Sequence, residues 1–232
     1  YLVFHHYGPQ SEGAGPIIDE LNQYLAMFRA LPGKQDGKAM ITETDAWFQG
    51  WAKQQFILDR QFRFIDHSED LLAVHQFCVL RYNESGNYDF GMIDRVGGVI
   101  PGTFWPYWLF RNWMGEASYG VVQGDRQGDV DLAASRDRRE GRTLESAVVR
   151  NRSQKPVTLQ ARFYFDPVEY DRVLATNAVS EDYCGVDSVE RVAAGADHLV
   201  RPLILAPGAA VALNLYEPGH PHLAFRDLNN QR

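Results

Sequence analysis

The sequence predicts a parallel α/β unit followed by an antiparallel β-sandwich. In the first half, short apolar runs that suit buried strands alternate with helix-length amphipathic segments. After about Gly115 the helical pattern disappears, and apolar residues alternate with polar ones instead. Strands that alternate with helices imply right-handed βαβ units in a parallel sheet. Several short strands separated by turn signals are typical of a sandwich.

The composition limits the classes of function. The 232 residues suit one large domain or two ordinary ones, and 45% hydrophobic with 23% charged residues is typical of globular proteins. The formal net charge of −7 argues against broad nucleic-acid binding. No apolar run approaches the roughly 20 residues of a membrane span. Cys78 and Cys184 supply neither a disulfide framework nor a metal set, and we expect no cofactor.

The first expected strand, residues 2–7, brings two polar side chains to one face. The strand is closed by Gly8 and the proline after it. Because side chains alternate along a strand, His5 and Tyr7 share one face and His6 takes the other.

A helix is expected next, with Pro16 in its first turn and residues 31–33 at its end. Its apolar stripe consists of Ile17, Ile18, Leu21, Tyr24, Leu25 and Phe28.

The second strand carries the main candidate catalytic residue. The apolar run 39–41 suits a buried strand and is followed by Glu43, with Trp47 and Trp51 just beyond, where a helix over 51–65 begins. Side chains at the carboxyl ends of strands line the active sites of parallel α/β barrels. A glutamate beside aromatic rings suits sugar cleavage, in which a carboxylate attacks or stabilises an oxocarbenium-like centre. The alternative is a Glu43 that caps or pairs at a loop.

Residues 71–80 predict a third buried strand, and 81–102 predict an irregular, Gly-rich segment. A further helix is expected to start at Thr103, with Pro106 in its first turn. Its apolar stripe consists of Trp105, Trp108, Leu109 and Trp113.

In the second half, the sequence predicts strands with one buried face and one solvent-exposed face. Residues 157–165 alternate strictly, and Val211, Leu213 and Leu215 repeat the pattern. Further expected strands lie at 144–149 and 199–205, and the charged stretch 136–142 is predicted as a solvated loop.

Taken in order, these segments resemble the carboxyl-terminal portion of a clan A glycoside hydrolase, most closely the β-xylosidase, α-arabinofuranosidase and agarase-like families. Those enzymes have a (β/α)8 barrel followed by a β-sandwich. His5-His6-Tyr7 is similar to the His-x-Tyr motif of their sixth strand, and Ile41-Thr42-Glu43 to the seventh strand, which ends in the nucleophile. The apolar run 71–80 and the aromatic helix 104–114 resemble the eighth strand and the last helix.

The resemblance implies that residues 1–117 are the carboxyl-terminal portion of a TIM-barrel catalytic domain, with strands six to eight. Residues 118–232 would form the β-sandwich domain. The overall class is therefore α/β plus all-β.

The resemblance also implies roles for particular side chains. Glu43 would be the nucleophile of a retaining mechanism, and Tyr7 would hydrogen-bond its carboxylate and keep it ionised. His5 would bind a sugar hydroxyl or orient the carboxylate. The alternative for His5 and Tyr7 is a satisfied pair in a barrel core. Weaker candidates for sugar subsites are Trp47, Trp51 and His75.

A retaining glycosidase needs a second carboxyl group, the acid/base, about 5 to 5.5 Å from the nucleophile. In this clan it precedes the His-x-Tyr strand, so we expect it outside this chain. Asn83-Glu84 imitates the usual dipeptide but follows Glu43 in a turn-rich context, and we predict a turn there. We expect the chain alone not to hydrolyse glycosides efficiently. The missing barrel strands would come from an unseen segment or another chain.

Three functions remain open at this stage. The first is part of a retaining glycoside hydrolase that acts on a plant or algal polysaccharide or oligosaccharide. The second is a non-catalytic carbohydrate-binding or structural module. The third is an unrelated α/β enzyme with a metal, although no helix-borne ligand spacing supports it. Its ligands would be drawn from His5, His6, Glu43, Asp45 and His75. The expected partner is a carbohydrate, with no nucleic acid and no membrane.

Overall fold

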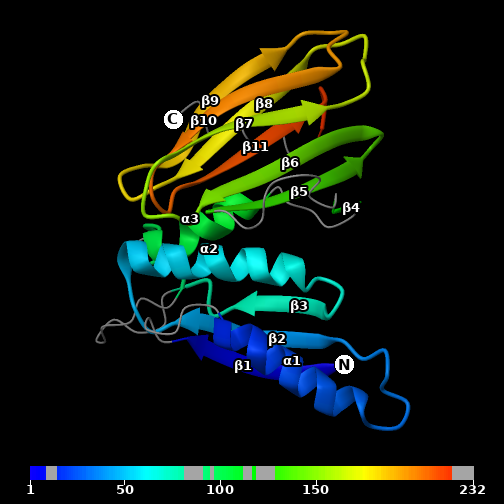
Figure 1. The fold of residues 1–232 in the computed structure, drawn as a ribbon, viewed down its shortest axis with the longest axis vertical. Helices are drawn as coiled ribbons and strands as arrows, with labels where there is room; N and C mark the ends of the chain where they lie inside the picture. Colours follow the sequence, from blue (N-terminus) through cyan, green and yellow to red (C-terminus); the bar gives the residue numbers. More distant parts are fainter. Residues whose placement is uncertain (9–14, 81–90, 95–96, 112–116, 119–128, 221–232) are drawn as a thin grey trace. The chain divides into compact units, whose positions relative to one another are not determined.

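The computed structural model of the chain describes residues 1–8, 15–80, 91–94, 97–111, 117–118 and 129–220 (Figure 1). They belong to two compact units, Tyr1–Tyr107 and Trp108–Arg232. None of the helices in the described part has the length and apolar character needed to cross a membrane.

The first unit contains a three-stranded parallel sheet. Its strands β1 (Leu2–Gly8), β2 (Ala39–Ala46) and β3 (Leu71–Gln76) lie in the order β1-β2-β3. Helix α1 (Gly15–Arg29) joins β1 to β2, and α2 (Gly50–Asp66) joins β2 to β3 (Figure 1). The predicted alternation of parallel strands and helices is confirmed. The described residues do not close a barrel.

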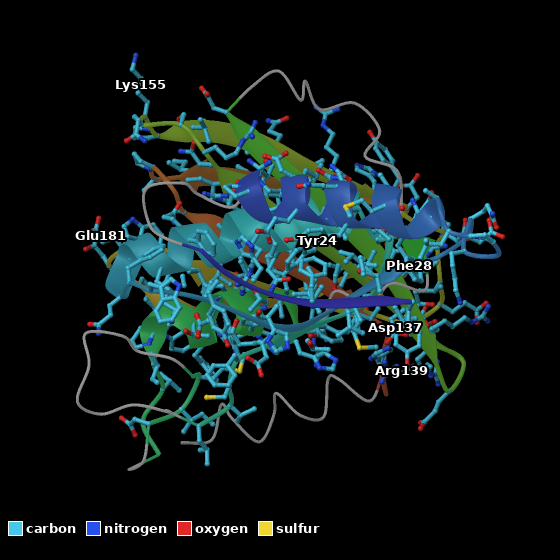
Figure 2. All side chains as sticks on the ribbon, turned by 90° about the horizontal axis from the view of Figure 1, so that it is seen from below. Tyr24, Phe28, Asp137, Arg139, Lys155 and Glu181 are labelled. Atoms are coloured by element: carbon cyan, nitrogen blue, oxygen red, sulfur yellow. The ribbon has the colours of Figure 1, made fainter. Side chains whose placement is uncertain are left out.

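The two faces of this sheet are different. One face packs on helices through a buried cluster of Ile17, Ile18, Leu21, Leu25, Ala39, Ile41 and Phe64. Fully burying one such aliphatic side chain stabilises a fold by about 1.5–3 kcal/mol. Phe4 joins this cluster, and its ring lies 5.4 Å from that of Tyr24, which projects from α1 near Phe28 (Figure 2). The predicted apolar stripe of α1 is thus largely confirmed, and polar side chains gather on the other face of the sheet.

Strand β3 is shorter than the predicted strand 71–80. Its pairing with β2 ends at the pair of Thr44 and Gln76, and beyond it Leu80 forms only an isolated bridge with Ile93. One backbone hydrogen bond continues from the Phe77 N–H to the Thr44 carbonyl, at 3.1 Å. Most of the segment predicted as irregular, including residues 81–90 with Asn83-Glu84, lies outside the described residues.

Helix α3 (Pro101–Phe110) begins two residues before the predicted cap. Pro101 accounts for this start, because a proline at the first helical position loses no hydrogen bond. Thr103 is therefore buried inside the first turn and does not cap the helix. Pro106 lies in the helix interior rather than in its first turn, which corrects a second expectation.

The second unit is sandwich-like. A six-stranded sheet has the order β4-β5-β6-β11-β8-β9, and a two-stranded sheet pairs β10 with β7. The strands are β4 (Ala117–Ser118), β5 (Val130–Arg139), β6 (Arg142–Asn151), β7 (Val157–Tyr164), β8 (Arg172–Val179), β9 (Cys184–Val192), β10 (His198–Leu205) and β11 (Ala210–Tyr216). Their pairings are antiparallel, as predicted.

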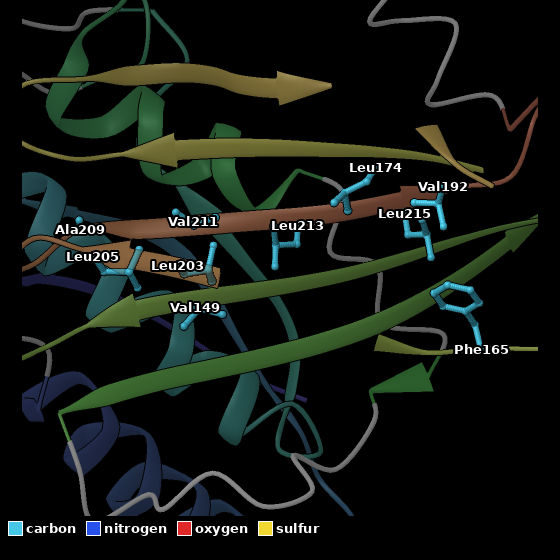
Figure 3. Packing of buried hydrophobic residues seen from close by; sticks show 10 residues of the cluster. All are labelled: Val149, Phe165, Leu174, Val192, Leu203, Leu205, Ala209, Val211, Leu213 and Leu215. Carbon is cyan, nitrogen blue, oxygen red and sulfur yellow. The ribbon is translucent and has the colours of Figure 1, made fainter. Parts of the chain in front are cut away.

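The core of this unit includes a cluster of aliphatic residues with one phenylalanine (Figure 3). Its buried members are Val149, Phe165, Leu174, Val192, Leu203, Leu205, Ala209, Val211, Leu213 and Leu215. Strand β7 shows the predicted alternation of a drier and a wetter face. Strand β11, which lies between β6 and β8 in the larger sheet, does not alternate, and all seven of its residues are buried. The prediction that one face of β11 is exposed to solvent was therefore wrong.

The charged stretch 136–142 is a hairpin rather than a solvated loop. It forms the end of β5 and the start of β6, joined by Glu140 at φ 52° and Gly141 at φ 73°. Two positive φ angles are what a tight hairpin turn requires. Asp137 is buried, and its Oδ2 lies 2.9 Å from Arg139 Nε; Figure 2 labels both side chains. The prediction failed because Arg136 and Arg138 lie on the exposed face of β5, whereas Asp137 between them is buried.

Asn151 at the end of β6 is a buried hydrogen-bonding centre. Its Nδ2 donates to the carbonyls of Lys155, Leu205 and Ala206 at 2.8, 3.0 and 3.0 Å. Its Oδ1 accepts from the backbone N–H and the hydroxyl of Ser153, both at 2.8 Å. This side chain ties the turn after β6 to the end of β10. Although Asn151 begins a glycosylation triplet, its amide is occupied inside the folded unit.

Replacing Asn151 by alanine is expected to destabilise the second unit by about 1–3 kcal/mol or more, the range for buried polar groups that lose a partner. Urea denaturation followed by far-ultraviolet circular dichroism measures this change. Asn151→Asp is the matched variant, because it retains the acceptor oxygen for Ser153 but loses all three donated bonds. Wild-type stability in both variants would show that Asn151 does not hold this turn.

Candidate active site

Three polar side chains meet on the face of the parallel sheet opposite α1. Tyr7 donates a hydrogen bond from its phenol to Glu43 Oε2 at 2.8 Å. His5 Nδ1 lies 3.4 Å from the same oxygen. The side chains of His5 and Glu43 are 53% and 37% exposed, so a ligand can reach this carboxylate. The adjacent strands β1 and β2 thus present an accessible carboxylate that accepts a hydrogen bond from a phenol.

A bulge in β2 determines where Glu43 points. Phe4 pairs with Ile41, but the next residue of β1, His5, pairs with Glu43, so Thr42 is an extra residue in β2. Under strict alternation Glu43 would share the face of Ile41, which is buried in the helix-side cluster. A bulge re-aims the side chains that follow it. Here it places Glu43 on the face of His5.

His6 lies on the opposite face, as alternation predicts. Its Nδ1 is 2.8 Å from Oε2 of Glu20 on α1, and the imidazole is nearly buried. His6 therefore fastens the first helix to the first strand and does not contribute to the Glu43 cluster.

Two aromatic rings flank Tyr7. The Trp47 ring centroid lies 5.4 Å from that of Tyr7 at an interplanar angle of 44°, and Trp47 is 45% exposed. The Phe77 ring lies 6.0 Å away in an edge-to-face arrangement of 76°. Sequence reasoning missed Phe77 because it lay within the apolar run assigned to a strand. Its signal would have been an aromatic residue at the carboxyl end of a parallel strand.

The phenol of Tyr7 is a hydrogen-bond donor throughout the physiological pH range. Burial, and then the hydrogen bond to Glu43, raise the pKa of Tyr7 far above its ordinary value. Both effects disfavour a second negative charge beside the carboxylate. Tyr7 therefore remains the donor in its hydrogen bond to Glu43.

The other two predicted site residues lie outside this contact network. Trp51 is half-buried in the first turn of α2, and His75 is an exposed residue of β3. Within the described residues no hydrogen bond or ion pair joins either of them to Glu43. Their assignment to sugar subsites stays a prediction.

A buried polar network lies behind Glu43 and was not foreseen from the sequence. Asp45 Oδ1 is 2.7 Å from Lys53 Nζ, and both side chains are fully buried. Burial raises the pKa of Asp45, while Lys53 and Arg60 oppose that change. Arg60, also fully buried, donates to Thr44 Oγ1 at 2.8 Å. Lys53 and Arg60 are seven residues apart on α2, so helical periodicity places them on similar sides of the helix.

The residues considered as metal ligands from the sequence have different surroundings in the structure. His5 and Glu43 lie on one face, His6 faces Glu20, and Asp45 is paired with Lys53. Among the residues that the structure describes, no three His, Cys, Asp or Glu side chains are grouped closely enough to hold a metal ion.

Comparison with solved structures gives extensive matches. An α-L-arabinofuranosidase of glycoside hydrolase family 51 from Thermotoga petrophila superimposes with a TM-score of 0.62 at 12% identity, over 91% of this chain and 52% of that chain. A glucosidase from Croceicoccus marinus gives 0.65 at 10% identity, over 94% and 53%. A β-porphyranase of family 86 from Bacteroides plebeius gives 0.51 at 12% identity, over 92% and 40%.

The chain shares its fold with glycoside hydrolases. The resemblance to clan A enzymes inferred from the sequence is thereby confirmed at the level of the fold. The chain spans about half the length of the arabinofuranosidase and the glucosidase. No protein-family model and no curated protein matches the sequence.

Proposed function

We propose that this chain is the carboxyl-terminal part of a retaining glycoside hydrolase, with Glu43 as its nucleophile. The observation that carries the proposal is the 2.8 Å hydrogen bond from Tyr7 to an accessible Glu43 in the carboxyl-terminal half of the parallel strand β2. The three parallel strands would be strands six to eight of a (β/α)8 barrel, whose active sites lie at the carboxyl ends of strands. The substrate would be a plant or algal polysaccharide or oligosaccharide.

In the proposed reaction the Glu43 carboxylate attacks the anomeric carbon while the bond to the leaving oxygen breaks. A second glutamate, from outside these 232 residues, protonates that oxygen and later removes a proton from the attacking water. The carboxylate must be ionised and correctly aimed at the moment of attack. The hydrogen bond from Tyr7 holds one oxygen of the Glu43 carboxylate and so helps to aim the group.

The aromatic residues suit a sugar ring. Pyranose and furanose rings have apolar C–H faces that pack against aromatic faces. Trp47 offers an exposed ring beside Tyr7, and Phe77 closes the other side. We propose that His5 binds a sugar hydroxyl or orients Glu43, and that Trp51 and His75 contribute to more distant subsites.

Covalent trapping tests the proposal directly. The natural full-length protein is incubated with activated 2-deoxy-2-fluoro glycosides of arabinose, xylose and glucose, digested, and examined by mass spectrometry. We expect one fluoroglycosyl group on the peptide that carries Glu43, and none in Glu43→Gln. Hydrolysis with the label on a different carboxylate would overturn the assignment of Glu43. Binding of oligosaccharides with no labelling and no hydrolysis would favour the non-catalytic module.

Replacing Tyr7 by phenylalanine is expected to lower kcat/KM roughly tenfold to hundredfold. A hydrogen bond to a charged group contributes about 1.5–3 kcal/mol, and each 1.4 kcal/mol is about a factor of ten. The phenylalanine keeps the ring contacts with Trp47 and Phe77, so the loss isolates the hydroxyl. Steady-state kinetics on an aryl glycoside measures the change. Unaltered kcat/KM would show that the phenol does not support the reaction.

A further inference from the structure

We propose that Arg60 of α2 is a positioning residue that holds Glu43 in its reactive orientation. This inference rests on the proposed function of Glu43. Arg60 is fully buried, although arginine is rarely found in that state without a specific role. A buried charge is weak evidence for added stability, because desolvation offsets its attractive contacts. The contacts of Arg60 instead indicate that it fixes the positions of neighbouring residues.

The guanidinium joins three elements. Nη1 donates to Thr44 Oγ1 of β2 at 2.8 Å, and Nη2 donates to Gln76 Oε1 of β3 at 2.9 Å. Nη2 also donates to the Tyr107 hydroxyl of α3 at 2.8 Å, and that hydroxyl donates to Gln76 Oε1 at 2.9 Å. Burial raises the pKa of Tyr107, which keeps this hydroxyl protonated. The planar fork of arginine makes these bonds in fixed directions.

Two of the three residues that Arg60 contacts are next to residues of the candidate site. Thr44 directly follows Glu43, and Gln76 directly precedes Phe77. Gln76 and Thr44 are also linked through Phe77. Gln76 Nε2 donates to the Phe77 carbonyl at 2.9 Å, and the Phe77 N–H donates to the Thr44 carbonyl at 3.1 Å. Arg60 therefore fixes the ends of β2 and β3 where the bulge in β2 has interrupted the regular pairing.

Arg60 supports the bulged part of β2 from the side of α2. An extra residue disrupts the hydrogen-bond ladder locally, so neighbouring strands constrain the bulged residues less. Thr44 is fully buried and points toward α2, so its bond to Arg60 replaces part of that constraint. A displacement of about 1 Å at a reacting group can lower a rate about a hundredfold. Loss of Arg60 would allow such a displacement of Glu43.

Two variants of the natural full-length protein test the proposal. Arg60→Lys keeps the positive charge but cannot reproduce the three bonds, and Thr44→Val removes only the acceptor beside Glu43. We expect both to lower kcat by about 10- to 100-fold, with KM little changed. Arg63→Lys is the matched control, because Arg63 forms a half-exposed ion pair with Asp59 on the same helix. It should leave kcat unchanged.

A spectroscopic measurement separates positioning from a general loss of structure. 3-Fluorotyrosine placed at position 7 reports on the hydrogen bond to Glu43 through its ¹⁹F chemical shift. We expect the resonance to move in Arg60→Lys and Thr44→Val, at temperatures where both variants are folded, and not in Arg63→Lys. An unmoved resonance with unchanged kcat in the Thr44→Val variant would overturn the proposal. If the wild-type protein hydrolyses no glycoside, the proposed function fails, while the ¹⁹F shifts still decide whether Arg60 positions Glu43.

Discussion

Replacing Glu43 by glutamine is expected to lower kcat of the natural full-length protein on aryl glycosides by roughly three orders of magnitude or more, the scale seen when a covalent nucleophile is removed. Glutamine has nearly the same shape, and its carbonyl oxygen can still accept the hydrogen bond from Tyr7. The neutral amide cannot attack the anomeric carbon. Steady-state hydrolysis of an aryl arabinofuranoside, xyloside and glucoside measures the effect.

Two further measurements make this result specific. Glu20→Gln is the matched control, because Glu20 contacts His6 on the helix side of the sheet and should leave hydrolysis unchanged. In Glu43→Gly, added azide should restore release of the aryl group by bonding to the anomeric carbon, which gives a glycosyl azide of inverted configuration. Full activity in Glu43→Gln would rule out its role as nucleophile. Hydrolysis by the 232-residue chain itself would show that the acid/base lies within it.

Replacing Asp45 by asparagine is expected to destabilise the first unit by about 3–5 kcal/mol, the range for breaking one partner of a buried ion pair. Asp45 and Lys53 are both fully buried and 2.7 Å apart. Asparagine keeps the size of the side chain and can still accept from the Ala46 N–H, a bond of 2.7 Å in the wild type. The charge of Lys53 would lose its counter-ion in a region of low dielectric.

Urea denaturation followed by tryptophan fluorescence measures this loss, since three of the five tryptophans, Trp47, Trp51 and Trp105, lie in the first unit. The double variant Asp45→Asn/Lys53→Met should recover most of the stability, because it removes the unpaired buried charge of Lys53. Asp70→Asn is the surface control. It breaks a partly exposed ion pair with Arg29 and should lower stability by at most about 1 kcal/mol. A similarly small loss in Asp45→Asn would show that water reaches the Lys53 charge.

The parallel half of the fold was largely readable from the sequence. Periodicity in 17–28 and the apolar runs near 2–7 and 39–41 predicted α1, β1 and β2 because each local pattern agrees with its tertiary surroundings. The end of β3 was not readable. Residues beyond Gln76 are as apolar as a strand, but their pairing with β2 stops at Thr44 although β2 itself continues to Ala46.

The sequence predicted the alternating pattern of a sandwich strand only where one face of the strand is exposed to solvent. Strand β7 alternates because one of its faces is more exposed, whereas all seven residues of the central strand β11 are buried. Strands β8 and β9 and the hairpin at Glu140-Gly141 were not predicted. Their charged and small residues look like loop composition until the sheet assigns alternate residues to opposite faces.

For the candidate site, the sequence alone determined which side chains are available. It placed His5 and Tyr7 on one face of a strand and Glu43 near the end of the next, because alternation is a local property of the backbone. Only the tertiary structure decided that these groups meet. The bulge at Thr42 turns Glu43 toward Tyr7, and the buried Arg60 reaches across from α2 to the residue beside it. Both depend on contacts between segments distant in the chain, which no local pattern of residues encodes.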